Sequence, residues 1–117
     1  MARISTHVLD TALGMPAKGV ALDLYVLEGG ARRRVASAVT NADGRTPGPL
    51  LSEEALPQAV FELTFHAGDY FRGLGLALPA PAFLDEIIIR FGVGDPHGNY
   101  HVPLLLSPYG YSTYRGS

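Results

Sequence analysis

The sequence predicts an all-β protein in which two sheets form a sandwich and one short helix is added. Apolar and polar residues alternate along most of the 117 residues, which is the pattern of strands that bury one face. Turn-forming residues, such as the pair Gly29–Gly30, interrupt the alternation about every ten residues. Six or more short strands separated by such turns are typical of a β-sandwich.

Three strands are predicted in the first half of the chain, at residues 3–9, 20–28 and 32–40. On the first strand, one face carries Ile4, Thr6 and Val8, and the other carries Arg3, Ser5 and His7. The second strand places four apolar side chains on one side: Val20, Leu22, Leu24 and Val26. The third begins with Arg32, Arg33 and Arg34, which point to both faces and indicate a solvated hairpin edge. Residues 41–44 (NADG) then form a tight turn, and Arg45 follows it directly.

Three more strands are predicted in the second half, at residues 58–65, 87–93 and 100–106. The inward side chains of the first two are apolar: Phe61, Leu63 and Phe65, then Ile87, Ile89, Phe91 and Val93. Residues 47–57 contain three prolines and are predicted to form a connection without strands. Residues 67–74 lose the alternation and are the one helical candidate, with Asp69 as its N-terminal cap. The tail from residue 107 is rich in tyrosine and hydroxyl side chains.

The length of the chain bounds its organisation, and residues 1–117 are predicted to form a single domain. Only 17% of the residues are charged, which favours a surface that another subunit or partner covers in part. A net charge of −2 argues against nucleic acid as a partner, because phosphate binding needs a basic face. The charge of the chain therefore argues against a nucleic-acid-binding protein and favours one that assembles with another subunit or partner.

Targeting segments and disulfides are not expected. There is no cysteine, so disulfides and thiolate metal sites are excluded. The first residues lack the apolar stretch of a signal peptide, and no apolar run is long enough to cross a membrane. We therefore expect a cytoplasmic protein that does not interact with membranes.

The four histidines are the first candidates for chemistry. His7 and His101 both project from strand faces that the alternation does not assign to the core. His66 ends a strand and His97 lies in a loop with proline and glycine, so both are expected to be solvated. Taken one at a time and on the residues alone, His7 and His101 are better explained as surface histidines, Arg45 as a turn residue and the tail as a frayed end.

Metal and serine chemistry find little support. His97 and His101 are four residues apart, but the intervening Gly98 and Asn99 make a helix there improbable. No cysteine and no helical HExxH pair is present, so no metal site is predicted. The Gly-x-Ser-x-Gly elbow of serine hydrolases is also absent. These residue patterns leave the function open.

Four blocks of the sequence resemble the 5-hydroxyisourate hydrolases of the transthyretin-like family. Residues 100–117 (YHVPLLLSPYGYSTYRGS) are similar to the C-terminal block of these enzymes, and residues 4–10 (ISTHVLD) to their first block. Residues 40–45 (TNADGR) and 68–71 (GDYF) match two further stretches. The last four residues, from Tyr114 to Ser117, are the tail that separates these enzymes from the hormone-carrying transthyretins. The resemblance implies a transthyretin-like two-sheet β-sandwich.

The resemblance also implies a reaction and a site. The expected activity is hydrolysis of 5-hydroxyisourate to 2-oxo-4-hydroxy-4-carboxy-5-ureidoimidazoline in urate degradation, with no metal or other cofactor. His7, Arg45 and His101 match the catalytic residues of the family, and His7, Arg45, Tyr114 and Ser117 match its substrate-binding residues. Which histidine is the general base stays open. A homotetramer, formed as a dimer of dimers, is the implied assembly.

One departure from the family pattern is visible in the sequence. The family commonly has His-Tyr-His before Val-Pro, whereas this chain has Asn99 at the first of these positions, which affects a secondary hydrogen bond or the local loop.

The alternative functions are a non-catalytic transthyretin-type small-molecule carrier and a purely structural sandwich. His7, His101 and the tail from Tyr114 to Ser117 together favour the hydrolase.

Overall fold

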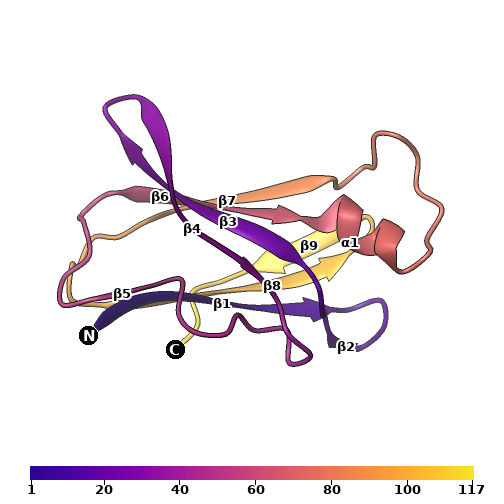
Figure 1. Ribbon diagram of the computed structural model, residues 1–117, viewed down its shortest axis with the longest axis horizontal. Coiled ribbons are helices and arrows are strands. Elements are labelled where there is room, and N and C mark those ends of the chain that lie inside the picture. The colour runs from indigo at the N-terminus through magenta and orange to yellow at the C-terminus, as the bar shows by residue number, and fades with distance from the viewer.

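Two β-sheets lie one above the other in the computed structural model, which describes residues 1–117 (Figure 1). The first sheet contains β1 (Ala2–Asp10), β2 (Met15–Pro16), β5 (Leu51–Glu53), β8 (Asn99–Ser107) and β9 (Gly110–Thr113). The second contains β3 (Ala21–Glu28), β4 (Ala31–Val39), β6 (Val60–His66) and β7 (Glu86–Gly92). The single helix, α1 (Ala67–Gly73), follows β6 directly. The predicted all-β sandwich with one short helix is confirmed.

The strand order brings the two ends of the chain together. The first sheet runs β2-β1-β8-β9, with β5 also paired to β1, and the second runs β4-β3-β6-β7. All neighbouring strands are antiparallel except β1 and β8, which are parallel. In this parallel pair Ser5 lies opposite His101, and His7 lies opposite Pro103. Both termini consequently lie at the same end of the molecule (Figure 1).

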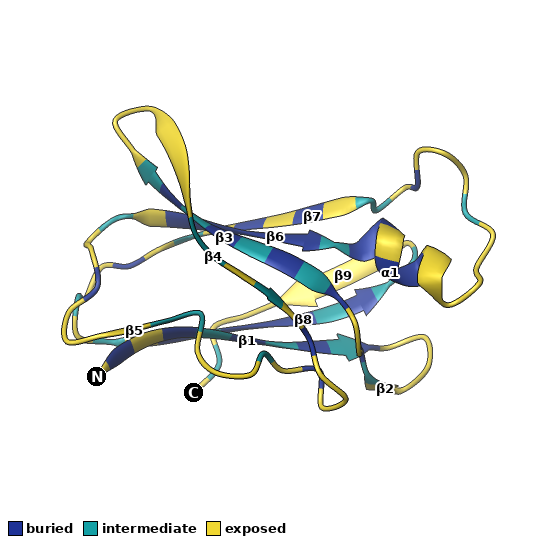
Figure 2. Cartoon of the chain, viewed as in Figure 1, coloured by how far each residue is buried: buried dark blue, intermediate teal, exposed yellow.

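The core between the sheets is formed by the apolar side chains of the alternating pattern that the sequence shows. The predicted inward residues of β1, β3 and β6 are buried: Ile4, Thr6, Val8, Leu22, Leu24, Val26, Phe61, Leu63 and Phe65. Val20, which directly precedes β3, is buried with them. Burial of each large apolar side chain contributes about 1.5–3 kcal/mol to folding. The opposite face of β1 is only half-covered at Ser5 and His7 and open at Arg3 (Figure 2). The alternation therefore leaves one polar face of the first sheet free for a site.

The six predicted strands are all present, and their bounds agree with the structure within two residues. The short strands β2, β5 and β9 were not predicted, and β5 lies inside the proline-containing connection. Strands of two to four residues are too short to show an alternation of their own. Each forms because a longer strand, β1 or β8, offers it an unpaired edge.

The predicted cap of the helix is wrong. The residue at the N-cap is His66, without a side-chain hydrogen bond, and Asp69 lies in the first turn. Because β6 runs straight into α1, the backbone of Asp85 takes the place of a capping side chain and accepts a hydrogen bond from Gly68 N at 2.9 Å. Asp69 instead lies near Arg72, at 3.4 Å.

No helix in the structure is long and apolar enough to cross a membrane.

The arginine run lies where the sequence predicted it. Arg32, Arg33 and Arg34 are exposed on the hairpin between β3 and β4, which projects from the second sheet (Figure 2). Each arginine lies within ion-pair distance of a carboxylate on β3 or β6. These cations are therefore neutralised at the surface and do not form a free basic patch.

Candidate active site

His7 and His101 lie on neighbouring strands of the first sheet, on the face that points away from the core. The alternation of β1 turns Ser5 and His7 to this face, and the alternation of β8 turns His101 to it. Both histidines are half-buried. The parallel register brings together residues from opposite ends of the chain.

Arg45 is held against β1 by the turn before it. The Asn41 side chain accepts hydrogen bonds from the backbone N–H groups of Asp43 and Arg45, at 3.0 and 3.2 Å. Gly44 then lies so close to β1 that its carbonyl accepts a hydrogen bond from Val8 N at 2.7 Å. A Cβ atom at Gly44 would lie 2.2 Å from Val8 O, and φ there is +75°, so only glycine fits. The turn thereby places Arg45 in a β-bridge with His7.

The ring of His7 is held by the same turn. Its Nε2 lies 2.7 Å from the carbonyl oxygen of Asp43. A carbonyl oxygen only accepts, so Nε2 carries the proton and donates it to this bond. In neutral His7 the lone pair is then on Nδ1, which is left available as an acceptor.

The ring of His101 is held from two sides. Its Nδ1 lies 2.9 Å from the hydroxyl oxygen of Ser5. Gly116 forms a β-bridge with His101, and its N–H donates to the His101 carbonyl at 2.7 Å. A Cβ atom on Gly116 would lie 2.5 Å from Cδ2 of the ring, so the glycine backbone packs directly against the imidazole. Nε2 of His101 has no hydrogen-bond partner within the chain and is the ring nitrogen available to a ligand.

The surroundings of His101 lower its pKa below the usual value of 6.5. Burial is the largest cause, followed by the positive charge of Arg45 and then by His7. Arg45 and His7, which form a β-bridge with each other, are thus the two neighbours that disfavour protonation of the His101 ring. These surroundings therefore favour the neutral imidazole, which has a lone pair to accept a proton.

The two tail residues differ in their placement. Ser117 directly follows Gly116, which is bridged to His101, and is exposed. The tail is thus folded back along β8 and is not a frayed end. Tyr114 is 60% exposed and lines a cavity of about 250 Å³ with Ile89, Phe91, Tyr100 and Val102. Within one chain the structure brings together His7, Arg45 and His101 but gives Tyr114 no hydrogen bond to them.

Ser5, Gly44 and Gly116 were not singled out from the sequence, although each one fixes a site residue. Ser5 shares the alternation of His7, which was visible, but its contact with His101 depends on the pairing of β1 with β8. Two strands about ninety residues apart in sequence carry no local signal of their register. Only the structure therefore identifies these three residues.

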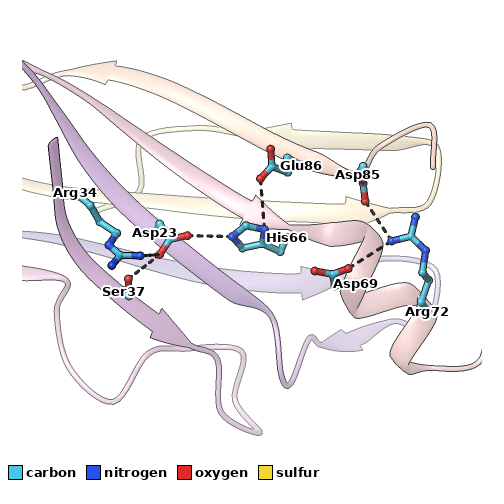
Figure 3. A network of polar contacts seen from close by, with 8 residues as sticks. All are labelled: Asp23, Arg34, Ser37, His66, Asp69, Arg72, Asp85 and Glu86. Atoms are coloured by element: carbon cyan, nitrogen blue, oxygen red, sulfur yellow. Dashed lines mark hydrogen bonds and ion pairs between the residues drawn. The ribbon is translucent and has the colours of Figure 1, made fainter. Parts of the chain in front are cut away.

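The remaining histidines lie elsewhere. His97 is exposed, as predicted. His66 was expected to be solvated, but its side chain is only 28% exposed and lies between Asp23, at 3.0 Å, and Glu86, at 3.5 Å (Figure 3). Burial opposes ionisation of Asp23, but hydrogen bonds from His66 and Ser37 outweigh it and lower the pKa of Asp23. This network is on the second sheet, and no three His, Asp or Glu side chains in the chain are grouped to hold a metal ion.

Comparison with known proteins assigns the chain to a family. A profile of the HIUase/Transthyretin family matches residues 4–116. The chain is 59% identical over 115 residues to the 5-hydroxyisourate hydrolase 2 of Rhizobium meliloti (strain 1021), covering 98% of this chain and 96% of that protein.

Two solved structures share the fold. The 5-hydroxyisourate hydrolase of Klebsiella pneumoniae is 36% identical, with a TM-score of 0.83 and full coverage of both chains. Sea bream transthyretin in complex with thyroxine is 29% identical, with a TM-score of 0.86, covering 98% of this chain and 95% of that one. Both similarities extend over the whole two-sheet sandwich, and the transthyretin-like fold is thereby confirmed. The chain belongs to the HIUase/Transthyretin family.

Proposed function

We propose that this chain is a 5-hydroxyisourate hydrolase, which opens the substrate to 2-oxo-4-hydroxy-4-carboxy-5-ureidoimidazoline. The relatives of this name at 44–59% identity over nearly the whole chain support this activity. The observation that carries the proposal is the convergence of His101, whose pKa is lowered, with Arg45 and His7 on one sheet face. A general base, a cation and a second imidazole are groups that can assist hydrolysis of a cyclic amide.

His101 is the proposed general base. Its Nε2 takes a proton from water as the water oxygen bonds to the substrate carbonyl carbon. Such assistance accelerates hydrolysis by about 10²–10⁴. When the carbon–nitrogen bond breaks, the imidazolium returns the proton to the leaving nitrogen. The hydrogen bond that Nδ1–H donates to the Ser5 hydroxyl oxygen leaves the lone pair on Nε2 and keeps the ring in one orientation throughout these steps.

Arg45 and His7 act on the other reacting groups. The Arg45 guanidinium donates hydrogen bonds to the carbonyl oxygen, on which negative charge develops during attack. Its backbone is held against β1 by the turn before it, so the exposed side chain extends over the site from a fixed point. His7 donates through Nε2 to Asp43 and so presents Nδ1 as an acceptor for water or for a substrate N–H. Tyr114 and Ser117 are proposed to close the pocket around the substrate.

The decisive experiment mixes the purified protein with freshly generated 5-hydroxyisourate and follows its ultraviolet absorbance. Accelerated decay relative to buffer is expected from a hydrolase. Binding of substrate with no acceleration would instead support the transthyretin-type carrier, and neither binding nor decay would support a purely structural sandwich. An all-β fold alone cannot decide between them.

The pH dependence follows from the lowered pKa of His101. Because only the neutral imidazole accepts a proton, kcat is expected to rise with pH through an inflection below 6.5 and then to level off. Replacing Arg45 with Gln removes a positive charge that opposes protonation, so the pKa of His101 should rise. An NMR titration of the His101 ring in both proteins measures this shift without any turnover. An unchanged titration in the Arg45→Gln variant would contradict the proposed proximity of the two side chains.

We also propose that the protein is a cytoplasmic homotetramer in which the polar face of the first sheet meets another subunit. The low charged fraction and the exposed apolar residues Ile88 and Tyr111, on β7 and β9, support an assembly. Light scattering at micromolar concentration is expected to give about four times the chain mass of 12.5 kDa. A stable monomer would contradict the tetramer. Activity in that monomer would also show that one chain completes the pocket.

A further inference from the structure

We propose that Arg3 and Arg45 form a subsite for the carboxylate group that hydrolysis creates. This inference rests on the proposed function and extends it, because Arg3 belongs to none of the blocks that suggested the activity. Arg3 lies on the same face of β1 as Ser5 and His7, two residues before Ser5. The subsite would therefore adjoin the proposed base.

A polar cavity connects the two arginines. It has a volume of about 180 Å³, and its lining includes Arg3, Ser5, Arg45 and Thr46 but no hydrophobic and no acidic residue. This volume is enough for a carboxylate with a few waters, since one water occupies roughly 30 Å³ in the liquid. Ser5, which lines the cavity, also contacts His101 Nδ1 through its hydroxyl group at 2.9 Å. The cavity and the reacting groups thus share a wall.

The charges in this cavity are uncompensated. The chain has nine Lys and Arg residues, and the five that form ion pairs are Arg32, Arg33, Arg34, Arg72 and Arg90. Arg3 and Arg45 have no carboxylate within ion-pair distance, although they line one cavity. Two like charges at one site repel each other, and a bound anion removes this repulsion. The forked guanidinium group is also the side chain best suited to hold a carboxylate.

The reaction supplies such an anion. The water oxygen bonds to the carbonyl carbon, the carbon–nitrogen bond breaks, and the nitrogen takes a proton. The new carboxylic acid then loses its own proton, so a neutral carbonyl becomes a carboxylate. Arg45 holds the oxygen during attack, and Arg3 adds a second cation once the charge is complete. The subsite should accordingly bind the product more strongly than an uncharged analogue.

Binding is tested first without turnover, using N-carbamoylglycine as a ureido carboxylate and its uncharged amide as the matched control. The arginine Nε–H signals in NMR spectra are followed during titration at low chloride. The carboxylate is expected to shift the Arg3 and Arg45 signals, and its affinity should fall about fivefold or more in an Arg3→Gln variant. The amide should cause no comparable shift. The matched variant is Arg33→Gln, whose side chain is 63% exposed and pairs with Glu28 on the other sheet.

Product inhibition gives the second measurement. The inhibition constant of the product is expected to rise about fivefold or more in Arg3→Gln and to stay unchanged in Arg33→Gln. Equal carboxylate affinity and equal product inhibition in wild type and Arg3→Gln would overturn the subsite, even in an active hydrolase. A protein that binds the carboxylate through Arg3 but does not hydrolyse 5-hydroxyisourate would overturn the proposed function and leave the anion subsite standing.

Discussion

Replacing His101 with Asn is expected to lower the turnover of 5-hydroxyisourate by about 10²-fold or more. Asparagine keeps a similar size and some hydrogen bonding, but it has no lone pair that accepts a proton at neutral pH. Its side chain would point to the polar face of the first sheet, away from the core, so the sandwich should fold normally. The measurement is kcat and kcat/KM from the ultraviolet assay, with a thermal denaturation curve to show that the variant is folded.

The matched control is His97→Asn, because His97 is an exposed loop histidine four residues before His101. This variant should retain full activity. A folded His101→Asn enzyme with near-normal turnover would remove His101 from the role of base. His7 would then be the remaining imidazole at the site, and its Nδ1 the candidate atom.

The alternation of side chains was enough to predict the long strands and the faces of most residues. It placed His7 and His101 off the core because a strand turns successive side chains to opposite sides. It did not predict that β1 and β8 are parallel neighbours, since register depends on contacts between distant segments. The contact between Ser5 and His101, which fixes the ring, therefore required the structure.

The roles of two glycines at the site could likewise not be predicted from the sequence. Gly44 follows a turn signal that was recognised, but its close approach to Val8 depends on where β1 lies. Gly116 was part of the recognised tail, yet only the β-bridge explains why the tail needs a glycine there. In both cases the sequence indicated the segment, while the tertiary contact determined the residue.

The shared fold also shows why residues must decide the function. Sea bream transthyretin, solved with thyroxine, superimposes on this chain with a TM-score of 0.86. The sandwich and its strand order are therefore compatible with a carrier. The half-buried His101, whose pKa is lowered and which lies near Arg45 and His7, is the base that we propose, and a carrier needs no base. The tail that packs against His101 is the second such feature, and it offers the sharpest test.

Deleting residues 114–117 is expected to abolish hydrolysis while leaving the sandwich intact. The deletion removes Gly116, which donates to the His101 carbonyl at 2.7 Å and packs against the imidazole ring. It also removes Tyr114 and Ser117, the proposed pocket residues. β9 ends at Thr113, so every strand of the first sheet is retained. Circular dichroism and light scattering should therefore match the wild type. The decay of 5-hydroxyisourate, in contrast, should be no faster with the variant than in buffer alone.

A smaller change tests the same contact without shortening the chain. In a Gly116→Ala variant the new Cβ would lie 2.5 Å from Cδ2 of His101, so either the ring or the tail must move. Turnover should fall by about tenfold or more, because misplacing a catalytic group by about 1 Å has large effects on rate. A His-tag after Ser117 should also impair turnover, while the same tag before Met1 should do less harm. Full activity in the deletion would show that His101 works without the tail, and the reason to prefer a hydrolase over a carrier would then rest on the histidines and Arg45 alone.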